Sequence, residues 1–133
     1  VSDLNLGVEG LNMFSRVFYF RNVEERVSVD PLYSIVHMRG KSPTWYRGYG
    51  KETIDKNEFA AIAKNMGAKK FVIGHTLHES VTYLMDKQVI DLDVLHAQGT
   101  TQGLLIENGQ EYMVDIQGQK SAIKERAKEV DDD

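Results

Sequence analysis

The chain lacks cysteine altogether, and its 133 residues include only two prolines and one tryptophan. The absence of cysteine excludes a disulfide framework and any thiolate metal site, so that His, Asp, Glu and Asn remain as metal ligands. No stretch approaches the roughly 20 consecutive apolar residues of a membrane span, and no signal-peptide pattern opens the chain. We therefore expect no membrane partner, and the compartment stays open between cytoplasm and periplasm.

An excess of basic residues is also missing. The chain has 16 Lys and Arg against 20 Asp and Glu, which gives a net charge of −4. Because binding along a nucleic-acid backbone normally needs a basic surface, we expect no nucleic acid as a partner. The length and the 41% hydrophobic content suit one globular domain. The chain opens on Val1 without a methionine or tag, which is typical of a segment of a longer polypeptide or of a processed chain.

Apolar spacing predicts two helices. Residues 8–23 carry apolar side chains three and four positions apart, as one face of an amphipathic helix requires. A second helix is predicted over residues 55–66, because Asp55 can cap it with Glu58 three residues on and Gly67 is placed to end it. Its expected buried stripe consists of Phe59, Ile62 and Met66.

From residue 71 onward the pattern changes to short strands, which we expect in one mixed sheet with antiparallel hairpins and flanking helices, an α/β (α+β) fold. The predicted strands cover residues 71–73, 81–84, 89–94, 103–106 and 112–116. Asp86-Lys87-Gln88 and Asn108-Gly109 have the composition of hairpin connections, and Asn-Gly is the strongest short hairpin signal. The charged residues 120–133 are expected to form a short helix that frays into a disordered tail.

The four histidines are His37, His75, His78 and His96. The apolar run 71–73 ends in Gly74-His75-Thr76, and α/β proteins bind ligands at the carboxyl ends of their strands. A strand end whose histidine faces solvent is the alternative interpretation. His75 and His78 are three residues apart in an expected turn, where they need not converge, so their spacing is a weak metal signal. His96 follows a strand and is the other candidate at a similar edge.

A second group of interest is Trp45-Tyr46-Arg47-Gly48-Tyr49. An arginine held between large rings has its guanidinium fixed in direction, and such a fork binds a phosphate or carboxylate with two hydrogen bonds. The alternative is packing of Arg47 on Trp45 in a surface loop, which contributes only about 0.5–1 kcal/mol when exposed.

Taken in order, these segments resemble a known family. The residues that carry the resemblance are the Trp45–Tyr49 run, the helix after it, Phe71 to Thr76, the strand pair over 81–93 and residues 102–109. Together they resemble the C-terminal half of a calcineurin-like metallophosphatase, nearest the bacterial (Shewanella-like) phosphoprotein phosphatases. The resemblance covers about residues 40 to 118. It implies a partial metallophosphatase sandwich, with residues 1–119 as the C-terminal portion of the domain and residues 120–133 as a charged tail.

The resemblance also implies roles for individual residues. His75 matches a metal ligand, Arg47 matches the arginine that holds the substrate phosphate, and His96 lies in a loop that borders the active site, as a second substrate-binding candidate. His78 departs from the small or polar residue often found there. It is expected either to contact the metal ligands without binding the metal itself, or to be exposed. The complete enzyme would use two divalent metal ions (manganese, iron or zinc) to activate a hydroxide for attack on phosphorus.

What is absent limits the function of this segment. The family's Asp-x-His, Gly-Asp-x-x-Asp, Gly-Asn-His-Glu and His-Gly-Gly motifs do not occur, so no catalytic residue is expected here. We therefore expect this chain to be the C-terminal segment of a metal-dependent phosphoesterase, a hydrolase of phosphate monoesters with serine/threonine phosphatase-like character. By itself, the chain is expected to be inactive. Its expected partners are a phosphorylated substrate, the missing N-terminal half, and a second copy through an uncovered sheet face.

One alternative belongs to a different class of protein. The chain could be a complete, non-catalytic α+β module that binds an anionic ligand or a partner protein through the Trp45–Arg47 loop. Motifs of the phosphatase family upstream in the gene would decide between the two. The sequence does not determine the substrate, because function depends on the site rather than on the fold.

Overall fold

The computed structural model describes residues 7–19 and 42–126. The chain divides into two compact units. Residues 1–48 and 54–69 make up the first, which we call the helical unit. Residues 49–53 and 70–133 make up the second, which we call the sheet unit. Arg47 therefore belongs to the helical unit, whereas His75 and His96 belong to the sheet unit.

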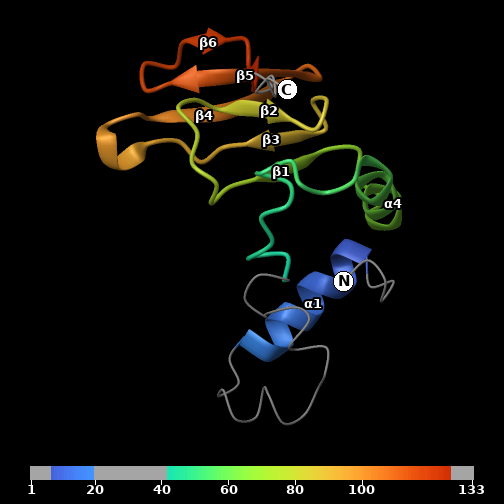
Figure 1. The fold of residues 1–133 in the computed structure, drawn as a ribbon. Helices are drawn as coiled ribbons and strands as arrows, with labels where there is room; N and C mark the ends of the chain where they lie inside the picture. The colour runs from blue at the N-terminus through green and yellow to red at the C-terminus, as the bar shows by residue number, and fades with distance from the viewer. Residues whose placement is uncertain (1–6, 20–41, 127–133) are drawn as a thin grey trace. The chain divides into compact units, whose positions relative to one another are not determined.

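Within its described residues, the helical unit has two α-helices, α1 (Gly7–Tyr19) and α4 (Lys56–Met66), which contact each other (Figure 1). The helix predicted over residues 8–23 is confirmed as far as Tyr19, and its last four positions lie outside the described residues. In the part of the chain that the structure describes, neither helix combines the length and the apolar character that crossing a bilayer would take.

Both ends of α4 form as the sequence predicts. One carboxylate oxygen of Asp55 accepts hydrogen bonds from the backbone N–H groups of Asn57 at 2.8 Å and Glu58 at 3.1 Å, which satisfies two donors of the first turn. Gly67 closes the helix in the left-handed conformation with φ 62°, and its N–H donates to carbonyls of the last turn. The buried side differs in part from the prediction. Phe59 and Ala63 are buried, one turn apart, while Ile62 and Met66 are only half-buried.

The sheet unit contains a four-stranded mixed sheet with the order β1-β3-β2-β7 (Figure 1). Its strands are β1 (Phe71–Ile73), β2 (Thr82–Leu84), β3 (Val89–Asp91) and β7 (Lys124–Glu125). Strand β1 is parallel to β3, β3 is antiparallel to β2, and β2 is parallel to β7. Because β1 and β3 are parallel and adjacent, the residues that follow them meet at one edge of the sheet.

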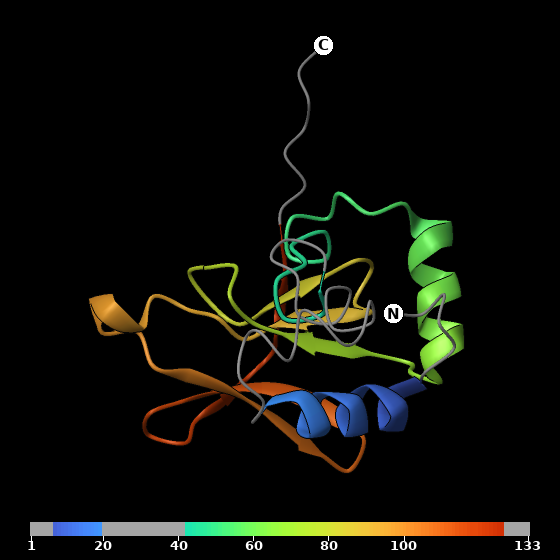
Figure 2. The ribbon, with the colours of Figure 1, turned by 90° about the horizontal axis from the view of Figure 1, so that it is seen from below.

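A second sheet is antiparallel and consists of β4 (Gln102–Glu107), β5 (Gln110–Asp115) and β6 (Lys120–Ser121). The predicted strands are thus confirmed, but the prediction that they share one sheet is wrong. The 3₁₀ turn η2 (His96–Gln98) lies where the chain passes from β3 to β4 (Figures 1 and 2). Beyond it, β4 pairs with β5 instead of with the first sheet.

Both predicted hairpins are present. Asn108 and Gly109 have φ values of 51° and 76°, as the two central residues of a type I′ turn require, and they join β4 to β5. The turn between β2 and β3 is less regular, since Met85, Asp86 and Lys87 all have positive φ.

The C-terminal segment forms strands where a helix was expected. Lys120 and Ser121 pair with β5, and Lys124 and Glu125 pair with β2, so this segment joins both sheets. The helix prediction is wrong over these residues because strand pairing satisfies the backbone groups that a short charged helix would leave open. The expected frayed end over 127–133 lies outside the described residues.

The core of the sheet unit lies between its two sheets. Val81, Ile90, Val94 and Ile123 are buried together, and Leu104 and Met113 of the second sheet pack against them. Figure 1 shows the three-stranded sheet, orange to red, stacked on the four-stranded one. The fold is therefore α+β with a two-sheet sandwich, in agreement with the predicted class, and it leaves the carboxyl ends of β1 and β3 at one edge.

Candidate functional site

The first candidate feature is the turn after β1. His75 follows Gly74 directly beyond the strand, is exposed, and has φ 77°. This left-handed conformation is uncommon for a residue with a Cβ, although histidine adopts it more often than most. The predicted placement of an imidazole at the carboxyl edge of the sheet is confirmed, and such an edge is where α/β folds bind ligands.

His78 and Asp91 form a buried pair beside this turn. The imidazole Nε2 of His78 lies 3.4 Å from Oδ2 of Asp91, with 14% of the His78 side chain exposed and none of the Asp91 side chain. Of the two alternatives for His78, an exposed side chain does not agree with the structure, whereas a position that supports the turn does. Burial raises the pKa of Asp91, while the hydrogen bond from the Asp93 N–H and the His78 imidazole act in the opposite direction.

A short strap, residues 49–53, packs along the sheet unit: Gly50 lies beside Thr76 at the carboxyl end of β1, whereas Tyr49 and Glu52 contact residues at the amino ends of β1 and β3. A Cβ on Gly50 would collide with the side chain of Thr76, so only glycine allows this approach next to His75. The ring of Tyr49 lies 5.6 Å from that of Phe71, and a carboxylate oxygen of Glu52 accepts a hydrogen bond from the Met85 N–H at 2.8 Å. The strap thus fixes the chain that directly follows the Arg47 loop.

Arg47 lies in the helical unit, at the end of the turn-rich loop 42–48. The carbonyl of the buried Ser42 accepts hydrogen bonds from the N–H groups of Trp45 at 2.9 Å and Tyr46 at 2.8 Å. The Tyr46 ring fills the space where a Cβ on Gly48 would stand. Burial first, and then the charge of Glu58, raises the pKa of Tyr46. Arg47 itself is half-buried, and it follows directly on the residues that these contacts fold.

His96 is exposed on the 3₁₀ turn η2, which Gly99 ends with φ 88°. Within residues 7–19 and 42–126, no three His, Asp or Glu side chains are grouped so that they could hold a metal ion. The described residues therefore offer His75 at the sheet edge without a group of three ligands around it. The role of His96 in substrate binding stays a prediction.

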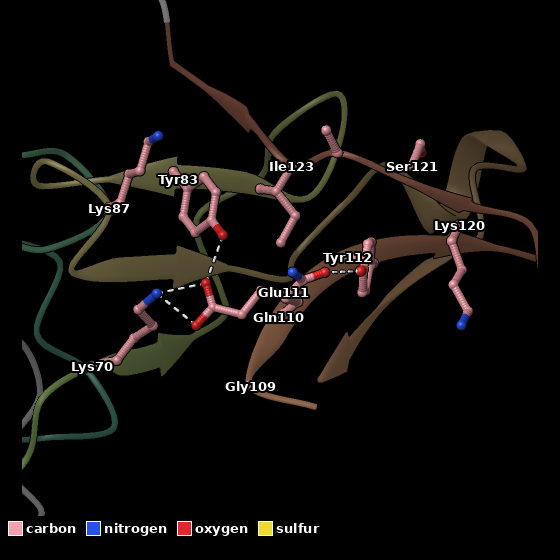
Figure 3. A pocket seen from close by; sticks show the side chains of 11 residues that line it. Lys70, Tyr83, Lys87, Gly109, Gln110, Glu111, Tyr112, Lys120, Ser121 and Ile123 are labelled. Atoms are coloured by element: carbon pink, nitrogen blue, oxygen red, sulfur yellow. Dashed lines mark hydrogen bonds and ion pairs between the residues drawn. The ribbon is translucent and has the colours of Figure 1, made fainter. Parts of the chain in front are cut away.

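A pocket of about 660 Å³ lies on another part of the sheet unit, beside the hairpin turn at Gly109 (Figure 3). In its middle, the Glu111 carboxylate accepts hydrogen bonds from Lys70 Nζ at 2.5 Å and from the Tyr83 hydroxyl at 2.5 Å. Partial burial alone would raise the pKa of Glu111, but the bonds from Lys70 and Tyr83 hold it below its usual value. Burial and the Glu111 carboxylate raise the pKa of Tyr83 to about 12. These three residues connect strands of both sheets.

We expect Glu111→Gln to destabilise the chain by about 1–2 kcal/mol near neutral pH, because a hydrogen bond to a charged group contributes roughly 1.5–3 kcal/mol and Lys70 is about one-third exposed to solvent screening. Since the folded-state pKa of Glu111 is lowered, its contribution is present above the unfolded pKa of about 4.3 and is lost as the pH falls through the folded value. Urea denaturation of both proteins at neutral pH and at a pH below the folded pKa of Glu111 measures this: the difference in the free energy of unfolding between wild type and Glu111→Gln should shrink at the lower pH. Glu107→Gln, which removes the exposed partner of Lys120, is the matched control and should change little. An equal loss in both variants would contradict the prediction.

No family model and no curated protein matches the chain. Solved structures do match. A cold-active protein-tyrosine phosphatase of a psychrophilic Shewanella species is 28% identical, with a TM-score of 0.75 over 90% of this chain and 36% of that chain. A point variant of a cold-active protein tyrosine phosphatase is also 28% identical, with a TM-score of 0.76. The structural relationship is phosphatase-like.

A further cold-active protein tyrosine phosphatase structure matches with 27% identity and a TM-score of 0.77 over 92% of this chain. In each case the chain spans 36% of the length of the matched structure. The predicted relationship to phosphatases, which are hydrolases, is therefore confirmed at this coarse level.

Two groups of the sheet unit, Asp91 and Glu111 with its partners, were not among the residues predicted from the sequence. Asp91 shares a strand face with Val89 in the apolar run of β3, so an acidic residue at an expected buried strand position was the available signal. Glu111 could not have been found in this way, because its partners Lys70 and Tyr83 are 41 and 28 residues away in the sequence. Of the predicted site residues, His75 and His96 share one unit, and Arg47 belongs to the other.

Proposed function

We propose that the chain is the C-terminal part of a metal-dependent phosphatase of the calcineurin-like class, which hydrolyses phosphate monoesters. The observation that carries this proposal is the exposed His75 at the carboxyl end of β1, in a fold that matches a phosphatase over 90% of the chain. An imidazole at such an edge is a common metal ligand. In this proposal His75 binds one metal and Arg47 binds the phosphoryl oxygens.

The residues present fit a metal only in part. His75 is exposed and able to coordinate, but the described ranges supply no cluster of three ligands around it. The proposal therefore requires further ligands from the motifs of the family that this sequence lacks. When bound, two divalent metals would polarise the phosphoryl group and supply a hydroxide nucleophile. The chain's own contribution is to hold one ligand at the sheet edge and one charged fork for the phosphate.

Arg47 has the chemistry that a phosphoryl group requires. Its planar guanidinium can donate two parallel hydrogen bonds to phosphate oxygens, which orients the ester as well as neutralising charge. The loop that carries it is folded through the Ser42 carbonyl and the Tyr46 ring, and it runs directly into the strap that packs beside Thr76. His96 is proposed as an additional substrate contact from its exposed turn.

The experiment is a phosphatase assay on this chain and on the longer polypeptide that the proposal implies. We expect this chain to release no phosphate from para-nitrophenyl phosphate, and the longer protein to hydrolyse it only with manganese or another divalent ion. Phosphotyrosine peptides are the first physiological class to assay, because the matched structures are tyrosine phosphatases. Metal-independent turnover, or anion binding without turnover in the longer protein, would reject the proposal.

A further inference from the structure

The two residues that directly follow β3, Leu92 and Asp93, hold both ends of the turn that carries His75. At its start, the Leu92 N–H donates to the carbonyl of Ile73 at 2.9 Å. At its end, the His78 N–H donates to the carbonyl of Asp93 at 2.9 Å. Between these two anchors His75 has its left-handed φ of 77°, a conformation that persists only where the surroundings hold it.

Beside the second of these hydrogen bonds lies the buried pair of Asp91 and His78. The Asp91 side chain is fully buried, and its Oδ1 accepts a hydrogen bond from the Asp93 N–H at 3.0 Å. Its Oδ2 lies 3.4 Å from His78 Nε2, and in the described part of the chain neither atom has a hydrogen-bond partner. A buried carboxylate with an unsatisfied oxygen is unfavourable, whereas a proton between the two groups would satisfy both.

We propose that Asp91 and His78 share one proton, and that this pair holds the turn of residues 74–78 closed against β3. The two residues are then positioning residues for His75. This role in the site rests on the proposed function, but the shared proton and its effect on the turn do not.

The surroundings of Asp91 favour retention of the proton. Opposite Asp91, β1 places Ile73 and β2 places Thr82, and neither is charged. Asp93 is the other charged group that acts on it, and its negative charge, like burial, raises the pKa of Asp91. A group whose pKa is raised in the folded state stabilises the fold at low pH, and this contribution is lost as the pH rises through the raised value. We therefore expect the turn to loosen as the pH rises.

The test is NMR on the full chain as a function of pH. We expect the Asp91 carboxyl carbon to titrate above the ordinary aspartate value of about 3.9. Over that same interval, amide exchange at Leu92 and His78 should rise beyond its intrinsic pH dependence, by about tenfold for each pK unit of the shift. Asp91→Asn should abolish this rise. Asp115→Asn is the matched control, because the Asp115 carboxylate only caps an exposed turn.

Two results would overturn the proposal: titration of Asp91 at or below its ordinary value, or amide exchange that does not follow that titration. If Asp91→Asn fails to fold, His78→Gln provides the second variant. Because the His78 imidazole is one of the two groups that share the proton, its loss should change the pH at which Asp91 titrates, and an unchanged titration would reject the pair. If amide exchange follows the titration of Asp91 but the longer protein binds no metal, the proposed function is rejected and the shared proton is not.

Discussion

Replacing His75 by alanine in the metal-loaded, longer protein will lower bound metal and phosphatase activity together, each by more than about a hundredfold. Loss of a residue that merely supports a ligand already costs about 10–100-fold in metal affinity or activity, so loss of the ligand itself should cost more. Activity falls with the metal because the metal supplies both the nucleophile and the Lewis acid. Metal analysis after gel filtration and initial rates with para-nitrophenyl phosphate measure the two effects.

The backbone of His75 requires a second variant. Alanine is unfavourable at φ 77°, so His75→Ala could disturb the turn as well as remove the imidazole. Glycine adopts this conformation readily, and His75→Gly therefore removes the ligand without that cost. We expect both variants to lose metal equally. Normal metal content and activity in His75→Gly would show that the imidazole is not a ligand.

The sequence predicted those features of the fold that depend on neighbouring residues. Asp55 and Gly67 bound α4 because capping involves groups within one turn of the helix. Asn108-Gly109 formed its hairpin because the turn needs two residues that accept positive φ. The short apolar run 71–73 predicted β1, and with it the edge position of His75.

The features that sequence analysis missed depend on pairing across long separations. The division into two sheets depends on β4 pairing with β5 and β6, and no local pattern specifies which sheet a strand joins. Lys120 and Lys124 are charged and exposed, so their composition indicated a solvated helix, yet their backbones complete two sheets. His78 was identified as a polar residue in a turn, but its burial against Asp91 follows only from the parallel pairing of β1 and β3.

Replacing Arg47 by alanine in the same longer protein should leave metal content near normal and reduce activity by about 2–4 kcal/mol of transition-state stabilisation, which is roughly 30- to 900-fold. That is the scale for loss of one preorganised group that stabilises developing charge. Arg47→Lys should restore only part of the activity, since an ammonium is a point charge without the planar fork. Lys51→Ala, which removes an exposed cation four residues on, is the matched control and should retain full activity.

The two measurements separate substrate binding from folding. If Arg47 binds the phosphate, its loss lowers kcat/KM while the metal stays bound, and the lysine variant lies between wild type and alanine. Full activity in Arg47→Ala would show that the guanidinium only packs within the loop of Ser42 and Tyr46. Equal loss of metal in the Arg47 and His75 variants would show that Arg47 acts through the folded state of the loop, because a group that contacts only the substrate cannot change how tightly the free enzyme holds its metal.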